Sequence, residues 1–300
     1  MPRQPHRWIV NTSTCQPINL STRQRKEMKD ILSDIVQTKL KEVEQFKNLL
    51  PEPQLHAMVE PLLGETVGSL AEALRQSATG IISEFKRRSP SKGWISEQAR
   101  ADIVPLSYQQ AGAAAVSILT DREYFAGHDE FIRVARASGV TIPILYKNFI
   151  VDEYQLFMAR QCGASAVLLI AACLDKDHCR QLMATARELG MEVLLEMHSP
   201  EEAEYAHLST DGVVCGVNNR NLGSFVTDVE NSFRMAELLP AESVKVSESG
   251  LKTAATIAEL RRMGYRGFLI GESLMSSDNP GQALKQLISE IEEQQTISKL

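Results

Sequence analysis

The 300-residue sequence lacks several features that mark whole classes of protein. No apolar run approaches the roughly 18 residues needed to span a bilayer, so we expect no membrane partner. The net charge of −6 argues against a general nucleic-acid-binding surface. The N-terminal residues form no hydrophobic signal region, and the composition is that of a soluble, cytoplasmic protein.

Cysteine is also scarce, and its pattern does not indicate metal binding. The five residues form no C-x-x-C pair and show no zinc-ligand spacing. Their odd number and scattered placement suit a reducing compartment better than a disulfide framework. Among the six histidines, His198 follows Glu196 by two residues, but no second histidine stands at a ligand-like spacing. We therefore expect no metal site.

What the sequence does contain is a repeat of eight short apolar runs separated by helix-length stretches. The runs are Ile81–Lys86, Ala115–Leu119, Ile142–Lys147, Ala166–Ile170, Val193–Glu196, Val213–Asn218, Val244–Glu248 and Gly267–Gly271. This alternation predicts an α/β fold, the (β/α)8 or TIM barrel, whose active sites lie at the C-terminal ends of the strands. Most runs end in charged or polar residues, so the repeat also predicts where the chemistry takes place.

The sequence divides into three segments. Residues 1–27 are polar and basic without periodicity and are predicted to be a disordered extension. An added tail, a targeting segment and a misassigned start are all compatible with it. Residues 28–78 are predicted to be an N-terminal helical segment, and residues 79–300 the catalytic barrel. Because the helical segment cannot bury its apolar faces alone, we expect it to pack on the barrel.

Helix boundaries outside the repeat follow from periodicity and proline. Apolar residues at three- and four-residue steps predict a helix from Met28 to Leu50, which Pro51 and Pro53 should end. A shorter helix is predicted around Ser69–Gln76, before the first strand. Pro280–Leu300 has the pattern of a closing amphipathic helix.

Polar side chains at the strand ends are predicted to converge, because residues two apart along a strand share a face. The residues expected at the barrel opening are Glu84, Lys86, Lys147, Glu196, Asn218, Arg220 and Glu248. For any one of them, a strand-end charge that simply reaches water is the ordinary interpretation. Charges are costly inside a barrel unless they are paired or functional, however. Their recurrence on five strands favours a site for general acid–base chemistry.

Three loops at the same end have the composition of a phosphate site. Ser89–Gly93 follows the first strand, while Ser247–Gly250 and Gly271–Ser273 end the seventh and eighth strands just before helices. Glycine before a helix lets backbone amides meet a phosphate, and barrels often bind phosphate after these two strands. Glycines that serve only as turn residues are the alternative for either loop alone.

Four aromatic residues lie near these strand ends. Trp94, Tyr124, Phe125 and Phe149 would suit a wall against a planar part of a substrate. Core packing is the commoner use of such residues, and both interpretations stay open.

The strand-end segments also match a known pattern in order. Glu84–Gly93 fits E-x-K-x-x-S-P-S-x-G, the most specific of the matches. The further matching segments are Ser117–Asp121 with Tyr124–Phe125, Lys147–Ile150, Leu168–Ala171, Glu196–His198, Gly216–Leu222, Glu248–Gly250 and Leu269–Glu272. With this set the sequence resembles the indole-3-glycerol phosphate synthase family from about Met28 to Met275.

The resemblance implies a reaction in which 1-(2-carboxyphenylamino)-1-deoxyribulose 5-phosphate closes its ring, loses CO2 and water, and yields indole-3-glycerol phosphate. It implies that Lys147 is the general acid at the ketose carbonyl. Glu196 would transfer protons and support the cationic intermediate, and Lys86 would lie near the substrate carboxylate and phosphate. Glu84 and Glu248 would orient and tune these groups. Which lysine acts in which step stays open.

The resemblance also implies how the substrate is held. Asn218 and Arg220 would hold the anthranilate end and the hydroxyls, and Phe125 and Phe149 are the aromatic residues that we expect against the substrate. The phosphate residues would be Ser89, Ser249, Gly250, Gly271 and the amide of Glu272.

Further expectations concern cofactors, partners and one departure from the family pattern. The family needs no metal or organic cofactor, and its partner is a small phosphorylated substrate. We expect a monomer or weak homo-oligomer that contacts other tryptophan-pathway enzymes. Asn148 stands where the family commonly has aspartate, and its side chain should point away from Lys147.

Two competing interpretations differ in testable ways. A phosphoribosylanthranilate isomerase typically works with a cysteine–aspartate pair at strand ends, whereas Glu84 and Lys86 end the first strand here. A barrel that only binds a phosphorylated metabolite would not need Lys86, Lys147 and Glu196 together. The residues therefore favour catalysis.

Overall fold

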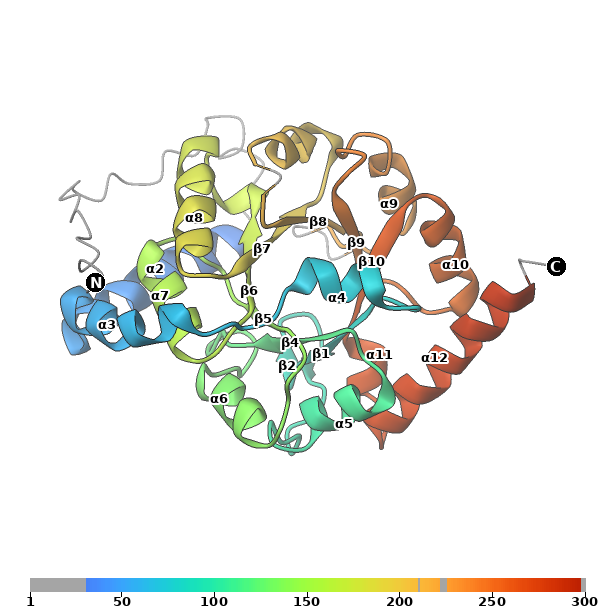
Figure 1. Ribbon diagram of the computed structural model, residues 1–300, viewed down its shortest axis with the longest axis horizontal. Helices are drawn as coiled ribbons and strands as arrows, with labels where there is room; N and C mark the ends of the chain where they lie inside the picture. Colours follow the sequence, from blue (N-terminus) through green and yellow to red (C-terminus); the bar gives the residue numbers. More distant parts are fainter. Residues whose placement is uncertain (1–30, 210, 222–225, 298–300) are drawn as a thin grey trace, which may run out of the picture.

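A computed structural model describes residues 31–209, 211–221 and 226–297 of the chain, so the predicted extension 1–27 lies outside the described residues. Eight parallel strands pair in sequence order and close into a barrel, as predicted (Figure 1). The barrel strands are β1 (Ile81–Phe85), β4 (Ala115–Leu119), β5 (Ile144–Lys147), β6 (Ala166–Ile170), β7 (Glu192–Met197), β8 (Val213–Asn218), β9 (Val244–Glu248) and β10 (Tyr265–Ile270). A short antiparallel pair, β2 (Arg88–Ser89) and β3 (Gly93–Trp94), follows β1.

Helices surround the barrel as an outer ring (Figure 1). They are α5 (Val104–Ala111), α6 (Glu130–Ala137), α7 (Glu153–Gln161), α8 (Lys176–Glu188), α9 (Glu230–Met235), α10 (Ala254–Arg262), α11 (Glu272–Met275) and α12 (Pro280–Ile297), with the 3₁₀ helices η2 (Ala171–Cys173) and η3 (Pro200–His207). The interior and the helix-facing side of the strands are both buried, which explains the near-continuous apolar runs.

The N-terminal helices differ from the prediction at one proline. Helix α2 (Ile31–Leu49) ends just before Pro51, as expected, but Pro53 lies in the first turn of a further helix, α3 (Glu52–Val59). Proline is tolerated there because the first backbone N–H groups of a helix have no partner within it. The 3₁₀ helix η1 (Glu60–Gly64) then leads toward the barrel.

Helix α4 (Leu70–Gln76) covers the N-terminal end of the barrel (Figure 1). Ser69 caps it by accepting from the backbone N–H of Glu72, and its hydroxyl donates to Glu192 Oε1 at the start of β7, 2.7 Å away. Leu70 and Leu74 are fully buried against the strands. This end of the barrel is therefore closed by apolar packing.

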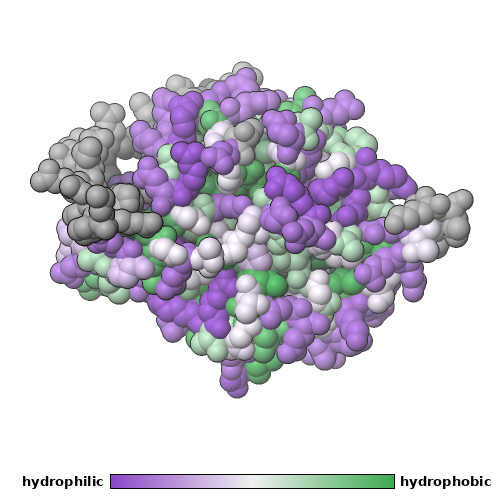
Figure 2. Space-filling model, viewed as in Figure 1, coloured by the Kyte–Doolittle hydropathy of each residue, from purple (hydrophilic) through white to green (hydrophobic). Residues whose placement is uncertain are grey.

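The face with α4 in front is mostly hydrophilic, with hydrophobic residues in small separate patches (Figure 2). Within the described parts of the chain, no helix is long and apolar enough to cross a membrane. Cys162, Cys173, Cys179 and Cys215 are free thiols buried in the fold, and Cys15 lies outside the described residues.

Candidate active site

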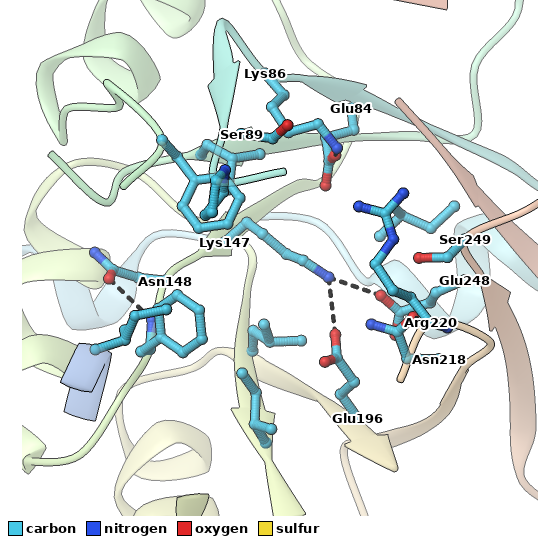
Figure 3. A pocket seen from close by; sticks show the side chains of 18 of the residues that line it. Glu84, Lys86, Ser89, Lys147, Asn148, Glu196, Asn218, Arg220, Glu248 and Ser249 are labelled. Carbon is cyan, nitrogen blue, oxygen red and sulfur yellow. Dashed lines mark hydrogen bonds and ion pairs between the residues drawn. The ribbon is translucent and has the colours of Figure 1, made fainter. Parts of the chain in front are cut away.

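The predicted strand-end residues meet in a cavity of about 140 Å³ at the C-terminal end of the barrel. Figure 3 shows the side chains pointing into it from strands on all sides. The sequence-predicted residues that line it are Glu84, Lys86, Ser89, Phe125, Lys147, Phe149, Glu196, Asn218, Arg220, Glu248 and Ser249.

Strand register explains why these side chains converge. Leu119 pairs with Lys147, Ile170 with Glu196, and Asn218 with Glu248. Paired residues in parallel strands share a face, and these six side chains all line the cavity, so the charged ones lie together in the layer at the top of the interior. The layers beneath are apolar, as at Leu194 and Val246, which are fully buried. The charged layer therefore rests on side chains that exclude water.

Lys147 occupies the middle of the charged layer (Figure 3). Its Nζ lies 3.1 Å from Glu196 Oε2 and 2.7 Å from Glu248 Oε2. Burial alone would lower the pKa of Lys147, but the charges of Glu248, Glu196 and Glu84 outweigh it and raise the pKa well above its usual value. Lys147 is therefore protonated at neutral pH, as a general acid must be before it reacts.

The two carboxylates that flank Lys147 are shifted in opposite directions. Burial acts against the charge of Glu196, but Lys147 and His198 together bring the pKa of Glu196 below its usual range. For Glu248, burial and the neighbouring charge of Glu196 outweigh Lys147 and raise the pKa. Two close carboxylates beside one lysine cannot both ionise at no cost. Glu196 is thus the carboxylate that stays charged.

Glycines make room for two of the carboxylates. A Cβ added at Gly216 would lie 2.5 Å from Glu248 Oε1, and one at Gly271 would lie 2.5 Å from Glu84 Oε1. Glycine inside or next to a strand often marks such a close approach. Gly271 was predicted to contact phosphate. The structure gives a separate reason for glycine at this position, because any larger residue would collide with Glu84.

Lys86 and Glu84, both at the end of β1, form a second ion pair, with 2.7 Å between Lys86 Nζ and Glu84 Oε1. Burial acts to raise the pKa of Glu84, but the charges of Lys86 and Lys147 more than offset it and keep the pKa low. The site thus has two paired lysines: Lys86 with a carboxylate of its own strand end, and Lys147 on β5 with carboxylates of β7 and β9.

The predicted phosphate loops lie beside Lys86, but not all their residues reach the cavity. The Ser89 hydroxyl is buried without a hydrogen-bond partner in the described structure, which leaves it free for a ligand. Ser249 has φ of 68° and Gly250 has φ of 75°, so the loop after β9 turns through the left-handed region. Gly250, Gly271 and Glu272 stand outside the cavity wall formed by the described residues.

Glu272, at the start of α11, is already engaged by two cations. Its Oε1 lies 2.6 Å from Lys92 Nζ, and its Oε2 lies 3.5 Å from an Arg220 nitrogen. Its side chain therefore connects the loop after β1 with the end of β8. The predicted role concerned its backbone amide, which these contacts leave unaffected.

Only two of the four candidate aromatic residues belong to the cavity. Phe125 and Phe149 line it, with ring centroids 6.2 Å apart. Trp94 is half exposed, with the Arg87 and Arg88 guanidinium groups over its ring. Tyr124 instead hydrogen-bonds through its hydroxyl to Thr38 on α2. Phe125 and Phe149 therefore stand where an aromatic wall would lie, whereas Trp94 and Tyr124 do not line the cavity formed by the described residues.

Asn148 points away from Lys147, as predicted (Figure 3). Its Nδ2 donates to the Thr120 hydroxyl at 2.8 Å, and its Oδ1 accepts from the backbone N–H of Phe149 at 2.9 Å. The residue orients the strand end without contacting the acid.

Sequence reasoning missed three residues near the site. Leu32 and Ile35 of α2 line the cavity, so the N-terminal helix contributes an apolar wall. His198, set aside for lack of a metal partner, lies 3.1 Å from Glu196 Oε1 through its Nε2. Its two-residue spacing from Glu196 was the signal, because it places both side chains on one face. Across the described ranges, no group of three or more His, Cys, Asp and Glu side chains is placed to hold a metal ion.

Comparisons with known proteins agree with this geometry. Residues 32–287 match the family model for indole-3-glycerol phosphate synthase. The chain is 49% identical over 265 residues to the indole-3-glycerol phosphate synthase of Bacteroides thetaiotaomicron. The aligned region covers 88% of this chain and 100% of the Bacteroides protein. It is 44% identical over 266 residues to the enzyme of the same name from Magnetococcus marinus, covering 86% and 98% of the two chains.

The barrel also resembles distant solved structures. The 3-hexulose-6-phosphate synthase of Salmonella typhimurium superposes with a TM-score of 0.53 at 12% identity, over 71% of this chain and 99% of that one. At this identity the likeness concerns the fold alone.

Proposed function

The chain belongs to the indole-3-glycerol phosphate synthase family, and on that premise we propose which of its residues carry the family's reaction. The reaction closes the ring of 1-(2-carboxyphenylamino)-1-deoxyribulose 5-phosphate with loss of CO2 and water, and yields indole-3-glycerol phosphate in tryptophan biosynthesis. The protein is a carboxy-lyase, and its partner is a small phosphorylated substrate.

Lys147 is the general acid for ring closure in this proposal. The observation that carries it is the position of Lys147 Nζ inside the cavity, between Glu196 at 3.1 Å and Glu248 at 2.7 Å. A protonated amine at the ketose carbonyl makes that carbon electrophilic, and the proton passes from Nζ to the carbonyl oxygen as the ring closes. Glu196, which stays ionised beside it, then stabilises the positive charge that develops on the ring.

Lys86 acts on the opposite side of the opening. Glu84 holds it at 2.7 Å, and Ser89 follows three residues later with its hydroxyl free of partners within the described chain. A cation here attracts the substrate's carboxylate and phosphate, and it can supply the proton needed when water leaves. Glu84 and Glu248 orient the two lysines.

The substrate's phosphate is proposed to lie between the loops after β1, β9 and β10. Ser89 and Ser249 supply hydroxyls, while Gly250, Gly271 and the amide of Glu272 supply backbone groups at a helix start. Backbone held in a sparsely populated conformation, as at Ser249, is typical of ligand sites.

The anthranilate ring is proposed to lie on the apolar side of the cavity. Phe125, Phe149, Leu32 and Ile35 form that side. Asn218 at the end of β8 and Arg220 just after it hold the anthranilate end and the hydroxyls, since both side chains line the cavity (Figure 3).

Organisation beyond the site is also a proposal. We propose a cytoplasmic monomer or weak homo-oligomer that contacts other tryptophan-pathway enzymes. Residues 28–78 form its N-terminal helical segment and residues 79–300 its barrel. The packing of α2 along the cavity supports a single working unit of helical segment and barrel.

The assignments at the anionic end can be tested with two variants in a steady-state assay that follows the fluorescent indole product. Lys86→Ala should raise KM and lower kcat, each by about tenfold, because it loses both attraction and proton supply. Ser89→Ala should raise KM about tenfold and weaken inhibition by inorganic phosphate in parallel. Exposed Ser276 provides the control, and Ser276→Ala should change neither constant. Unchanged phosphate inhibition in Ser89→Ala would refute the phosphate assignment.

A further inference from the structure

His198 lies directly after β7 and is close to the carboxylate of Glu196. Its side chain is 9% exposed, and its Nε2 lies 3.1 Å from Glu196 Oε1. The other oxygen of the same carboxylate, Oε2, receives Lys147 Nζ at 3.1 Å. Each oxygen of Glu196 therefore faces a different basic group, one inside the cavity and one behind it.

The backbone of His198 is held on both sides. Its N–H donates to Glu202 Oε2 at 2.6 Å, and its carbonyl oxygen accepts from Asn231 Nδ2 at 3.0 Å. The same Asn231 amide donates to the carbonyl oxygen of Asn218 at 3.1 Å. Asn231 therefore links the end of β7 to the end of β8. Because the backbone of His198 is held on both sides, the position of its imidazole relative to Glu196 is restricted.

The charge of the imidazole follows from the groups around it. Glu196 faces Nε2, and Glu202 Oε2 lies 3.7 Å from Nδ1. The Cys173 thiol on η2 is a further titratable group that interacts with the same two carboxylates. Burial raises the pKa of the Cys173 thiol, which therefore stays neutral. Burial also acts to lower the pKa of His198, but its contacts with the two carboxylates raise that pKa to about 9. The ring is thus an imidazolium at neutral pH.

We propose that His198, supported by Glu202, is a positioning residue that keeps the carboxylate of Glu196 ionised and aimed into the cavity while Lys147 gives up its proton. This inference rests on the proposed role of Glu196. Once Lys147 has protonated the ketose oxygen, its amine is neutral and no longer attracts Glu196 strongly. The imidazolium then remains as the cation that holds the carboxylate in its charged form, at the step where a positive charge develops on the ring.

His198 itself does not reach the substrate. It is absent from the cavity wall that the described residues form, and Glu196 stands between its ring and the opening. Its effect must therefore pass through Glu196. Loss of His198 should change the rate and its pH dependence more than the affinity for substrate.

Two variants at His198 separate positioning from simple structural support. His198→Ala removes the charge and the contact, and kcat should fall about 30-fold with KM changed less than about threefold. His198→Gln keeps an amide donor near the position of Nε2 but no charge, so it should restore only a small part of that loss at pH 7. In the wild type, kcat should decline as pH rises through about 9, and His198→Gln should lose this decline. His207, exposed on η3, gives the matched control, since His207→Gln should behave as wild type.

The outcomes distinguish this inference from its premise. Wild-type kcat and an unchanged pH profile in both His198 variants would overturn the inference, as would a rise in KM alone. If His198→Ala does not fold, the pH profile of His198→Gln still decides. Glu196→Gln serves as the reference: full activity there would refute the role of Glu196 itself, whereas an inactive Glu196→Gln beside a normal His198→Ala would refute only the role of His198.

Discussion

Two largely buried clusters in this molecule have the same composition, one lysine between two carboxylates. In the first, Lys147 Nζ lies 3.1 Å from Glu196 and 2.7 Å from Glu248. In the second, Lys39 Nζ on α2 lies 2.5 Å from Glu42 and 2.6 Å from Asp121, which follows β4. Only the first is proposed to do chemistry.

The difference between the clusters lies in what surrounds the carboxylates. Asp121 Oδ1 accepts hydrogen bonds from the backbone N–H groups of Tyr124 at 2.7 Å and Phe125 at 3.1 Å. With its ion pair to Lys39, the aspartate therefore binds α2 to the loop after β4. Glu248 Oε1, by contrast, has no hydrogen-bond donor in the described structure, and its cluster borders the cavity. A carboxylate oxygen that has neither a hydrogen-bond donor nor a cation and borders a cavity is typical of a reactive site, whereas both oxygens of Asp121 are engaged, one by Lys39 and one by backbone N–H groups, as in a structural site.

Exchanging one carboxylate in the first cluster should give the largest effect on turnover. Glu196→Gln should lower kcat about 10³-fold with little change in KM, because it removes the charge used for proton transfer and for the cationic intermediate. Steady-state kinetics on the purified variant measure this. Asp121→Asn is the matched change in the second cluster and should leave kcat close to wild type. Equal losses of kcat in the two variants would abolish the distinction between the clusters.

Breaking the second cluster should instead destabilise the fold. Lys39→Met leaves the buried Asp121 and the partly buried Glu42 without their cation. It should lower the free energy of unfolding by about 3 kcal/mol, with kcat within roughly threefold of wild type. Urea unfolding at pH 7 is the measurement. Exposed Lys41 on the same helix offers the control, and Lys41→Met should leave the free energy unchanged. A loss of kcat as large as in Glu196→Gln would make Lys39 part of the catalytic site.

A smaller effect is expected from the pH dependence of stability around His198. Its pKa is about 9 in the fold, above the ordinary value of 6.5. A raised pKa stabilises the fold fully below pH 6.5, and this contribution declines above that value and is lost as pH rises through about 9. The difference in unfolding free energy between wild type and His198→Gln should therefore shrink between pH 6 and pH 10. A difference that stays constant over this range would mean that the ring is not charged.

The fold could be predicted because its signal is local and repeated. Apolar runs such as Ala115–Leu119 and Ala166–Ile170 gave strand boundaries that agree with the structure. The third run was shorter than expected, since β5 begins at Ile144, after Pro143, which has no N–H for the ladder. Helix α3 was missed because Pro53 signals a helix end in the sequence, although it stands in a first turn.

The site was predictable where alternation along a strand decides direction. Lys147, Glu196 and Glu248 face one opening because each occupies an inward position near the end of its strand. Alternation gives no direction beyond the strand, so it could not decide whether Trp94 and Tyr124 line the cavity, and neither does among the described residues. Leu32 and Ile35 reach the cavity through packing between segments far apart in the chain, which no local pattern encodes.

The central claim, that Lys147 is the acid for ring closure, is tested most directly by a single-turnover experiment with Lys147→Ala. The substrate would be titrated by the change in its anthranilate fluorescence, and product formation would be followed in the same mixture. The account predicts saturable binding within a few-fold of wild type and a rate of ring closure at least about 10³-fold lower. Collapse of affinity together with an undiminished rate at saturation would contradict it.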